Sequence, residues 1–236
     1  MTLVLLLALA FPGARIANLP TGPGLEPGRW QLSISHRFLS APDNRLLGNA
    51  LNFLKDANVR LAAERGLPGR FSAGLSYNNY NYELGAGVSW AALDRLTASA
   101  GIGTNLVERT LSTTWLNAAV AGHVTPVPRV HLVALPRLTT NTEDLYLSIG
   151  LGAKAGLPAD FSVGLEAEPV LAGPTPHVGR RLLAWNLALD RELGWHNFTL
   201  VLGNAWHQSV PGWFSDANRD VLKGHFRAGF AILRRL

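Results

Sequence analysis

The stretch GNAWHQS carries the residue types of a hydrolase active site. Asn204, His207 and Ser209 would supply an orienting group, a base and a nucleophile. However, His207 and Ser209 are neighbours on one face of a strand at the start of a loop, and no neighbouring residue orders the serine. We therefore expect a hydrogen-bonding cluster at a strand end and not an enzyme, with a hydrolase as the remaining alternative.

Two histidines give an equally incomplete metal site. His123 and His131 flank the turn TPVPR and would face each other across a hairpin, but they make at most half a zinc site and no carboxylate lies within the hairpin. The chain has no cysteine, which excludes thiolate metal ligands, disulfides and a cysteine nucleophile. We expect no metal and no cofactor. The net charge of +5 comes mostly from scattered arginines, so nucleic acid is not an expected partner.

Two sets of charged residues indicate more about the function than the candidate hydrolase and metal sites do. Both sets occupy the polar positions of stretches in which apolar and polar residues alternate. One set is basic and is expected on the first, second and last strands. The other is acidic and is expected on the ninth and tenth strands. If the last strand pairs with the first, the two sets form two walls of a lumen. The charged side chains would then either form buried ion pairs across the lumen and plug it, or line a polar pore with a transverse electric field. The basic wall is Arg29, Arg37, Arg60 and Arg227, and the acidic wall is Glu166, Glu168, Asp190 and Glu192.

The strands that would position these walls are indicated by a repeated phrase. GLPGRFSAGL begins at Gly66 and GLPADFSVGL begins at Gly156. Pro, Gly and Asp favour a tight turn, and strict alternation of apolar and polar residues follows in each copy. In the first copy Phe71 and Leu75 fall on one face and Ser72 falls on the other. Each copy therefore predicts a turn that starts a strand with one apolar face.

The same periodicity along the chain predicts an all-β domain of about twelve strands. The expected strands are 29–38, 57–65, 70–77, 82–90, 95–104, 111–124, 129–138, 144–155, 161–170, 181–192, 197–207 and 223–235. Alternate connections are tight, such as GLPG and LGWH, and most of the others are longer. This arrangement is typical of outer-membrane barrels. We predict a single antiparallel transmembrane β-barrel in a bacterial outer membrane, with tight turns in the periplasm and longer loops outside the cell.

Three features indicate that the apolar face points outward to lipid. The polar positions are rich in glycine, whereas a soluble exterior would favour Lys, Glu and Thr. A soluble barrel of this strand number would enclose a cavity too wide for side chains to fill. Aromatic residues gather near strand ends, as they do at both interfaces of a membrane. The expected girdles are Trp30, Phe71, Phe161 and Phe198 at one end and Tyr77, Tyr82 and Trp206 toward the other.

The N-terminus has the features of a secretion signal. Residues 3–11 form an apolar run of signal-peptide length, and Ala8 with Ala10 offers a cleavage site, although no positive residue precedes the run. A buried first strand or helix is the alternative. We expect a signal segment at 1–14, a periplasmic lead-in at 15–28 and the barrel at 29–236.

Two stretches within residues 18–78 resemble a known family. GRWQLSISHRF followed by DANVRLAAERGLPGRFSAGLSY is similar to the start of the bacterial DUF5777 β-barrel proteins. In that family a first strand ending in Ser-His-Arg-Phe precedes a hairpin of similar sequence. The resemblance implies an outer-membrane barrel and brings no activity or catalytic residue. Outer-membrane barrels usually end on an aromatic residue, and this chain departs from that pattern at Leu236.

These observations together predict a narrow passive channel for small solutes or ions. Its partners would be outer-membrane lipid and the barrel-assembly machinery. One alternative is a non-conducting membrane scaffold for a periplasmic or extracellular protein, and a second is a soluble ligand-binding β-barrel. The lumen separates the first two, because an interior filled by side chains favours a scaffold and an open polar path favours a channel.

Overall fold

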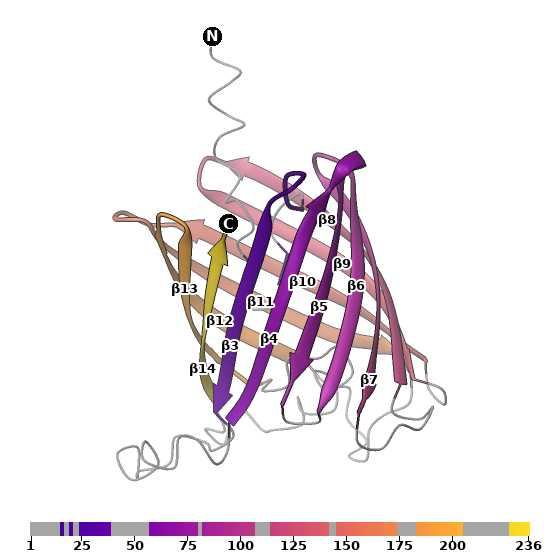
Figure 1. The fold of residues 1–236 in the computed structure, drawn as a ribbon. Helices are drawn as coiled ribbons and strands as arrows, with labels where there is room; N and C mark the ends of the chain where they lie inside the picture. The colour runs from indigo at the N-terminus through magenta and orange to yellow at the C-terminus, as the bar shows by residue number, and fades with distance from the viewer. Residues whose placement is uncertain are drawn as a thin grey trace.

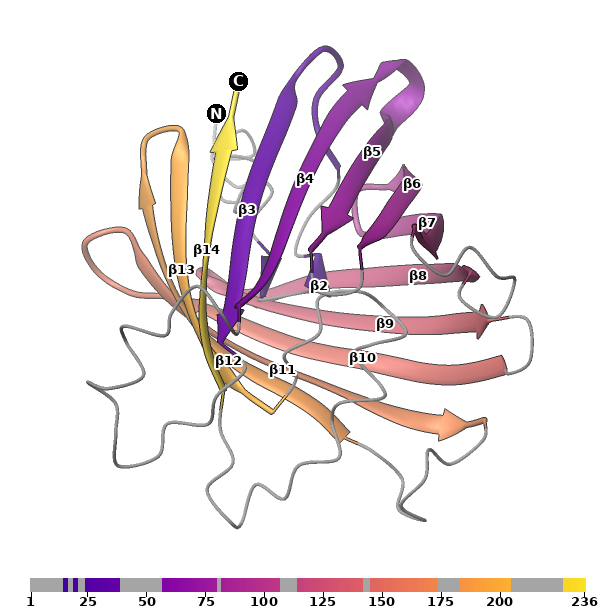
Figure 2. The ribbon, with the colours of Figure 1, turned by 60° about the horizontal axis from the view of Figure 1, so that its bottom comes forward.

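The structure is a computed structural model that describes residues 15–16, 19–20, 24–38, 57–79, 82–106, 114–141, 145–173, 183–204 and 227–236. In these residues twelve strands close into one antiparallel barrel. A separate two-stranded sheet lies inside the ring of strands (Figure 2). The predicted all-β fold and strand number are confirmed. The expected signal segment lies outside the described residues.

The barrel strands follow the chain in order around the ring, and each pairs with its neighbours in sequence. Their bounds are β3 (Trp30–Phe38), β4 (Ala57–Leu67), β5 (Phe71–Asn78), β6 (Glu83–Leu93), β7 (Leu96–Asn105), β8 (Thr114–Val127), β9 (Val130–Asn141), β10 (Leu145–Gly156), β11 (Phe161–Ala172), β12 (Leu183–Leu193), β13 (His196–Gly203) and β14 (Arg227–Arg235). The inner sheet consists of β1 (Arg15–Ile16) and β2 (Leu19–Pro20).

The barrel closes where the last strand meets the first. β14 pairs with β3 in antiparallel register, with Ile232 opposite Ile34. The Trp30 N–H donates to the Leu236 carbonyl at 3.1 Å, and the Leu236 N–H donates to the Trp30 carbonyl at 2.9 Å. The start of β3 and the end of the chain therefore lie side by side at one rim of the barrel (Figure 1).

That rim also holds the tight turns, and we call it the tight-turn end. A 3-10 turn (Pro68–Arg70) joins β4 to β5, and its Arg70 guanidinium donates to Asp94 of the next turn at 2.5 Å. Gly194 in the turn between β12 and β13 has a φ of 58°, a left-handed conformation in which a side chain would be strained. The opposite rim, the loop end, carries connections that lie largely outside the described residues.

The two faces of the wall differ as the alternation predicts. Large apolar side chains cover the outside, and Leu75 and Leu200 are 63% and 62% exposed there. Polar side chains such as Ser162 and Asn186 point inward and are buried. So large an exposed apolar surface is unfavourable in water and suits the hydrocarbon of a bilayer. Among the described residues, no helix is long and apolar enough to cross a membrane.

Inward glycines leave space for neighbouring side chains to lie flat against the wall. A methyl group added at Gly229 would lie 2.7 Å from Cδ of Arg37, and one added at Gly203 or Gly103 would collide with Asn186 or Trp115. The glycine-rich inner face therefore accommodates large polar and aromatic side chains within the curvature of the barrel.

Candidate functional site on the lumen wall

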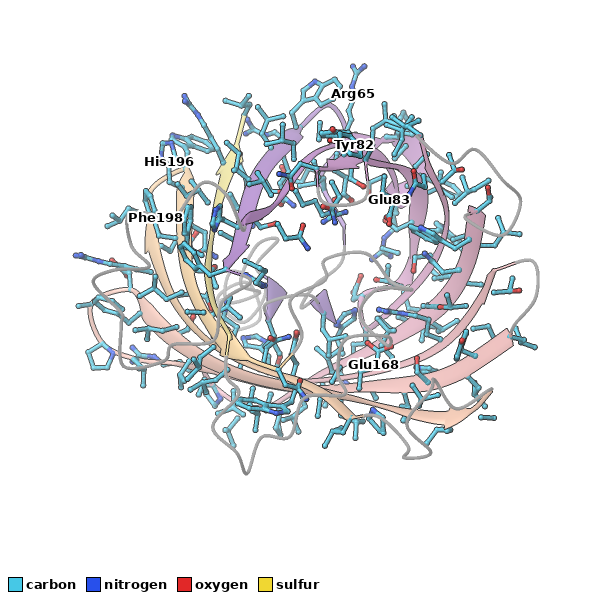
Figure 3. All side chains as sticks on the ribbon, turned by 90° about the horizontal axis from the view of Figure 1, so that it is seen from below. Arg65, Tyr82, Glu83, Glu168, His196 and Phe198 are labelled. Atoms are coloured by element: carbon cyan, nitrogen blue, oxygen red, sulfur yellow. The ribbon has the colours of Figure 1, made fainter. Side chains whose placement is uncertain are left out.

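Three of the four predicted acidic residues lie buried on the inner wall. Glu166 and Glu168 come from β11 and Asp190 from β12, because alternation along each strand places these residues on the same face as Ser162 and Asn186. In Figure 3 Glu168 points into the barrel, as Glu83 does from the far side. Glu192, at the tight-turn end of β12, is only half-buried. The inner wall therefore concentrates carboxylates over two adjacent strands.

Asp190 is neutralised by a lysine that the sequence analysis did not assign to a wall. The ammonium Nζ of Lys154 lies 2.9 Å from Oδ2 of Asp190, and both side chains are almost completely buried. The Thr199 hydroxyl donates to Oδ1 of the same carboxylate at 2.5 Å. Lys154 belongs to β10 and Asp190 to β12, so this ion pair spans the strand between them.

Glu168 has a similar arrangement. Its Oε1 accepts a hydrogen bond from the Ser148 hydroxyl at 2.7 Å and lies 3.3 Å from a guanidinium nitrogen of Arg137. Arg137 is on β9, and the pair again spans one intervening strand. A carboxylate with no water contact is stable only when it is paired and hydrogen-bonded. Arg137 and Lys154 supply that compensation for two of the three buried acids.

Glu166 accepts hydrogen bonds from two neutral donors. The Asn186 side-chain amide donates to Oε1 at 2.9 Å, and the backbone N–H of Leu19 in the inner sheet donates to Oε2 at 3.0 Å. The acidic wall thus contacts the N-terminal part of the chain through this carboxylate.

The predicted basic residues occupy different places. Arg37 points inward from β3, is 2% exposed and lies against Gly229. Arg60 is half-buried on the inner face of β4. Arg29 differs from the expected position, because it precedes β3 and lies at the tight-turn rim, with its guanidinium 5.7 Å from the centre of the Trp195 ring. The backbone of Arg227 begins β14, but its side chain lies outside the described residues.

The residues considered for metal or hydrolytic chemistry do not assemble into a site in the described structure. His123 and His131 both face inward, and Nδ1 of His131 lies 3.0 Å from the Thr125 hydroxyl. Within the described ranges, no group of three or more His, Cys, Asp or Glu side chains is placed to hold a metal ion. His207 and Ser209 lie outside the described residues, and the Asn204 amide donates to the Leu183 carbonyl at 2.7 Å.

Aromatic residues surround the outside of the tight-turn end. The Arg65 guanidinium stacks over Trp30 at 5.3 Å, and Arg191 stacks over Phe161 at 5.0 Å. Phe71 stacks on Trp90 with centroids 5.9 Å apart. We call this set, together with Phe198 and His196, the tight-turn girdle.

Figure 3 shows Arg65, His196 and Phe198 pointing away from the lumen. Sequence reasoning missed Arg65, Arg191 and Trp90. Their positions directly opposite aromatic residues across strand pairs are the signal that would have found them. Toward the loop end, Tyr77 is half-buried and Tyr82 is exposed. Trp206 lies outside the described residues.

The arrangement is a closed barrel with an apolar exterior and a charged interior, and comparison with known proteins agrees with it. The family described as membrane bound beta barrel domain (DUF5777) matches residues 116–236, more than half of the chain. The chain belongs to this family. The match covers the second half of this DUF5777 barrel, whereas the strand and hairpin that indicated the family from the sequence lie before it. No curated protein matches the chain.

Two solved outer-membrane barrels share the fold of this DUF5777 barrel. A KdgM porin is 10% identical, with a TM-score of 0.54 over 86% of this chain and 98% of that one. LpxR from Salmonella typhimurium is 11% identical, with a TM-score of 0.52 over 86% of this chain and 99% of that one. At such low identity the similarity establishes the architecture alone.

Proposed function

We propose that this protein is a narrow passive channel for small solutes or ions in a bacterial outer membrane. The observation that carries the proposal is the closed barrel whose outer face is apolar and whose inner face carries charged and polar side chains. Charged groups in a low-dielectric enclosure attract and order permeating ions.

The direction of the ion pairs supports a path through the barrel. Lys154 pairs with Asp190 and Arg137 pairs with Glu168, and each pair joins strands separated by one strand of the same wall. Such pairs run along the wall and do not require side chains to bridge the full diameter. Because most of the acidic charge is neutralised locally, the channel is expected to have weak ion selectivity.

Liposome swelling tests the channel proposal. Vesicles that contain the purified, folded barrel are diluted into solutions of neutral sugars of increasing size. A channel predicts swelling that is fast for the smallest sugar and slows with size, while vesicles with heat-denatured protein do not swell. Equal behaviour of folded and denatured protein would contradict the proposal.

A non-conducting scaffold is the second candidate, and the burial of the inner residues favours it. Arg37, Lys154 and Glu168 are each at most 2% exposed, so solvent barely reaches these groups. A scaffold would leave all sugars excluded while the barrel remains folded in the vesicles. The soluble ligand-binding barrel is not supported, because the family is membrane bound.

The outer-membrane location and the insertion route belong to the same proposal. The family and the two neighbouring structures support a bacterial outer membrane, where the barrel-assembly machinery would insert the chain. Cell fractionation is expected to recover the protein with outer-membrane lipid, and depletion of that machinery is expected to reduce the folded form. Recovery in the inner membrane would overturn this location.

A further inference from the structure

The inner sheet occupies a defined place on the lumen wall. In Figure 2 β2 is visible inside the ring of barrel strands. β1 contacts β10 and β11, and β2 contacts β9. Ile16 pairs with Leu19 in the inner sheet, and both side chains are 0% exposed. These residues fall in the stretch expected to lead into the barrel from the periplasm, and the structure places them within the barrel itself.

Three glycines of the wall make room for these two side chains. A methyl group added at Gly150 would lie 2.7 Å from Cδ2 of Leu19. One added at Gly152 or Gly164 would lie 2.8 Å from Ile16. Contacts this short are not tolerated, so any side chain at these glycines would displace the inner sheet or force its side chains to move.

The wall is also apolar at this place, although it is polar around most of the inner face. Leu135, Ala119 and Ala121 are buried and form one apolar cluster with Leu19. Inward apolar side chains on the wall of a water-filled lumen would be exposed to water without a cover. We call Gly150, Gly152, Gly164 and Leu135 the socket.

A polar contact fixes the position of the inner sheet along the wall. The backbone N–H of Leu19 donates to Oε2 of Glu166 at 3.0 Å, while Asn186 donates to the other oxygen of that carboxylate. A charge-assisted hydrogen bond of this kind is stronger than a neutral one and is directional. The socket therefore matches the inner sheet in shape, and Glu166 beside it matches the inner sheet in hydrogen bonding.

We propose that the socket is a docking site for the chain's own N-terminal segment, by which we mean the inner sheet of β1 and β2. We further propose that this docked segment narrows the lumen. The first half of this proposal concerns binding and stands on the contacts above. The second half rests on the proposed channel function. The occupant is a part of the same chain whose backbone and apolar side chains fill the socket.

A disulfide tests docking without any measurement of transport. The chain has no cysteine, so an introduced pair has no competing thiol. The Ile16→Cys/Gly164→Cys variant is expected to form an intramolecular disulfide in the folded barrel, because the two positions are within the reach of such a bond. The control is Ile16→Cys/Gly87→Cys, since Gly87 is an inward position on β6 whose nearest neighbours are Ala100 and Gly101.

The bond is detected by mass spectrometry of proteolytic fragments. Linkage of residues 16 and 164, with none between 16 and 87, supports docking. Equal linkage in both variants, or none in either, would overturn it.

Conductance tests the second half of the proposal. Gly152→Leu fills the socket and is expected to raise single-channel conductance by displacing the segment. Gly87→Leu adds the same bulk to the lumen elsewhere and is expected to lower conductance or leave it unchanged. If Gly152→Leu does not fold, Leu19→Asp leaves the wall intact and places a carboxylate beside Glu166, which should also release the segment and raise conductance.

Failure of the docking proposal can be distinguished from failure of the proposed channel function. A specific disulfide with no conductance in any folded variant would uphold docking and reject the channel. Conductance without a specific disulfide would uphold the channel and reject docking. A change in the same direction for Gly152→Leu and Gly87→Leu would show that bulk alone matters and would reject the narrowing role of the segment.

Discussion

Lys154 on β10 and Asp190 on β12 form an ion pair of 2.9 Å on the lumen wall, with β11 between their strands. Neither side chain has appreciable contact with solvent. A pair in such a place has lost the hydration of both ions, so each depends on the other for its stability. This dependence gives the pair a measurable signature.

Removal of one partner is therefore expected to be costly. Lys154→Gln should lower the free energy of unfolding by about 3 to 5 kcal/mol, because it leaves the Asp190 charge buried with only neutral donors. Urea unfolding of the barrel in lipid vesicles measures the change. Arg70→Gln is the matched control, since the Arg70–Asp94 pair is exposed and its loss should cost about 1 kcal/mol or less. Equal losses for the two variants would mean that the Lys154 pair is hydrated.

The inward and outward assignment is tested by adjacent residues of one strand. Leu187 lies on the exposed apolar face of β12, and Ala188 lies buried on the inner face. Leu187→Arg should destabilise the barrel by about 2 to 4 kcal/mol if it lies near the bilayer midplane. Ala188→Arg should cost less if water reaches this part of the lumen, and more in a packed lumen, because Ala188 is completely buried. The same unfolding measurement applies. Unchanged stability of Leu187→Arg would contradict the outward, lipid-facing position of Leu187.

The tight-turn girdle offers a test of its arginine contacts. Arg65→Gln removes the cation above Trp30 and is expected to lower the free energy of unfolding by about 0.5 to 1 kcal/mol. Arg65→Lys keeps a cation at the same place and should retain part of that stability. Tryptophan fluorescence during unfolding measures the stability of both variants. No difference between Gln and Lys would assign the effect to packing of the side-chain stem and not to charge.

If the barrel conducts, its ion preference is expected to depend on the two charged walls. Neutralising Glu166, Glu168 and Asp190 together should shift selectivity toward anions, and neutralising Arg37, Arg60 and Arg227 should shift it toward cations. Reversal potentials in a salt gradient measure the shifts. If the charged groups instead pair with one another and fill the lumen, both triple variants should unfold more easily. Their ion selectivity should then show neither of these shifts. Unchanged selectivity and stability in both would place these side chains outside the conduction path.

Orientation in the membrane is a separate prediction. With the tight turns in the periplasm, an epitope tag inserted after Asn44 or after Ser215 should bind antibody on intact cells. A tag at Pro158, in a tight turn, should bind antibody only after permeabilisation. Antibody binding on intact cells to the Pro158 tag but not to the other two would show that the tight turns face the outside of the cell.

Much of the fold was predictable because a barrel wall with one apolar and one polar face imposes a period of two residues on the sequence of each strand. Alternation of apolar and polar residues located all twelve strands, and the turn phrases located their boundaries at the tight-turn end. The inward position of Glu166, Glu168 and Asp190 follows from the same period. Each of these inferences uses only residues that are close in sequence.

The ion pairs and the inner sheet were not predictable in this way. Lys154 and Arg137 are single cations on their strands, and their partners lie two strands away, at positions set by the stagger of the barrel. The contact of Ile16 and Leu19 with Gly150 and Gly164 joins residues far apart in the sequence, and a two-residue strand has no measurable periodicity. Such contacts arise only when the closed wall exists.

Single-channel recording in planar bilayers tests the central claim most directly. Purified, folded protein added to one side of the bilayer should produce discrete and uniform conductance steps, small in size because the lumen contains the inner sheet. Steps should be absent when denatured protein is added. A barrel that inserts into the bilayer and remains silent at all voltages, both as the natural sequence and as Gly152→Leu, would contradict a channel and leave the scaffold as the remaining candidate.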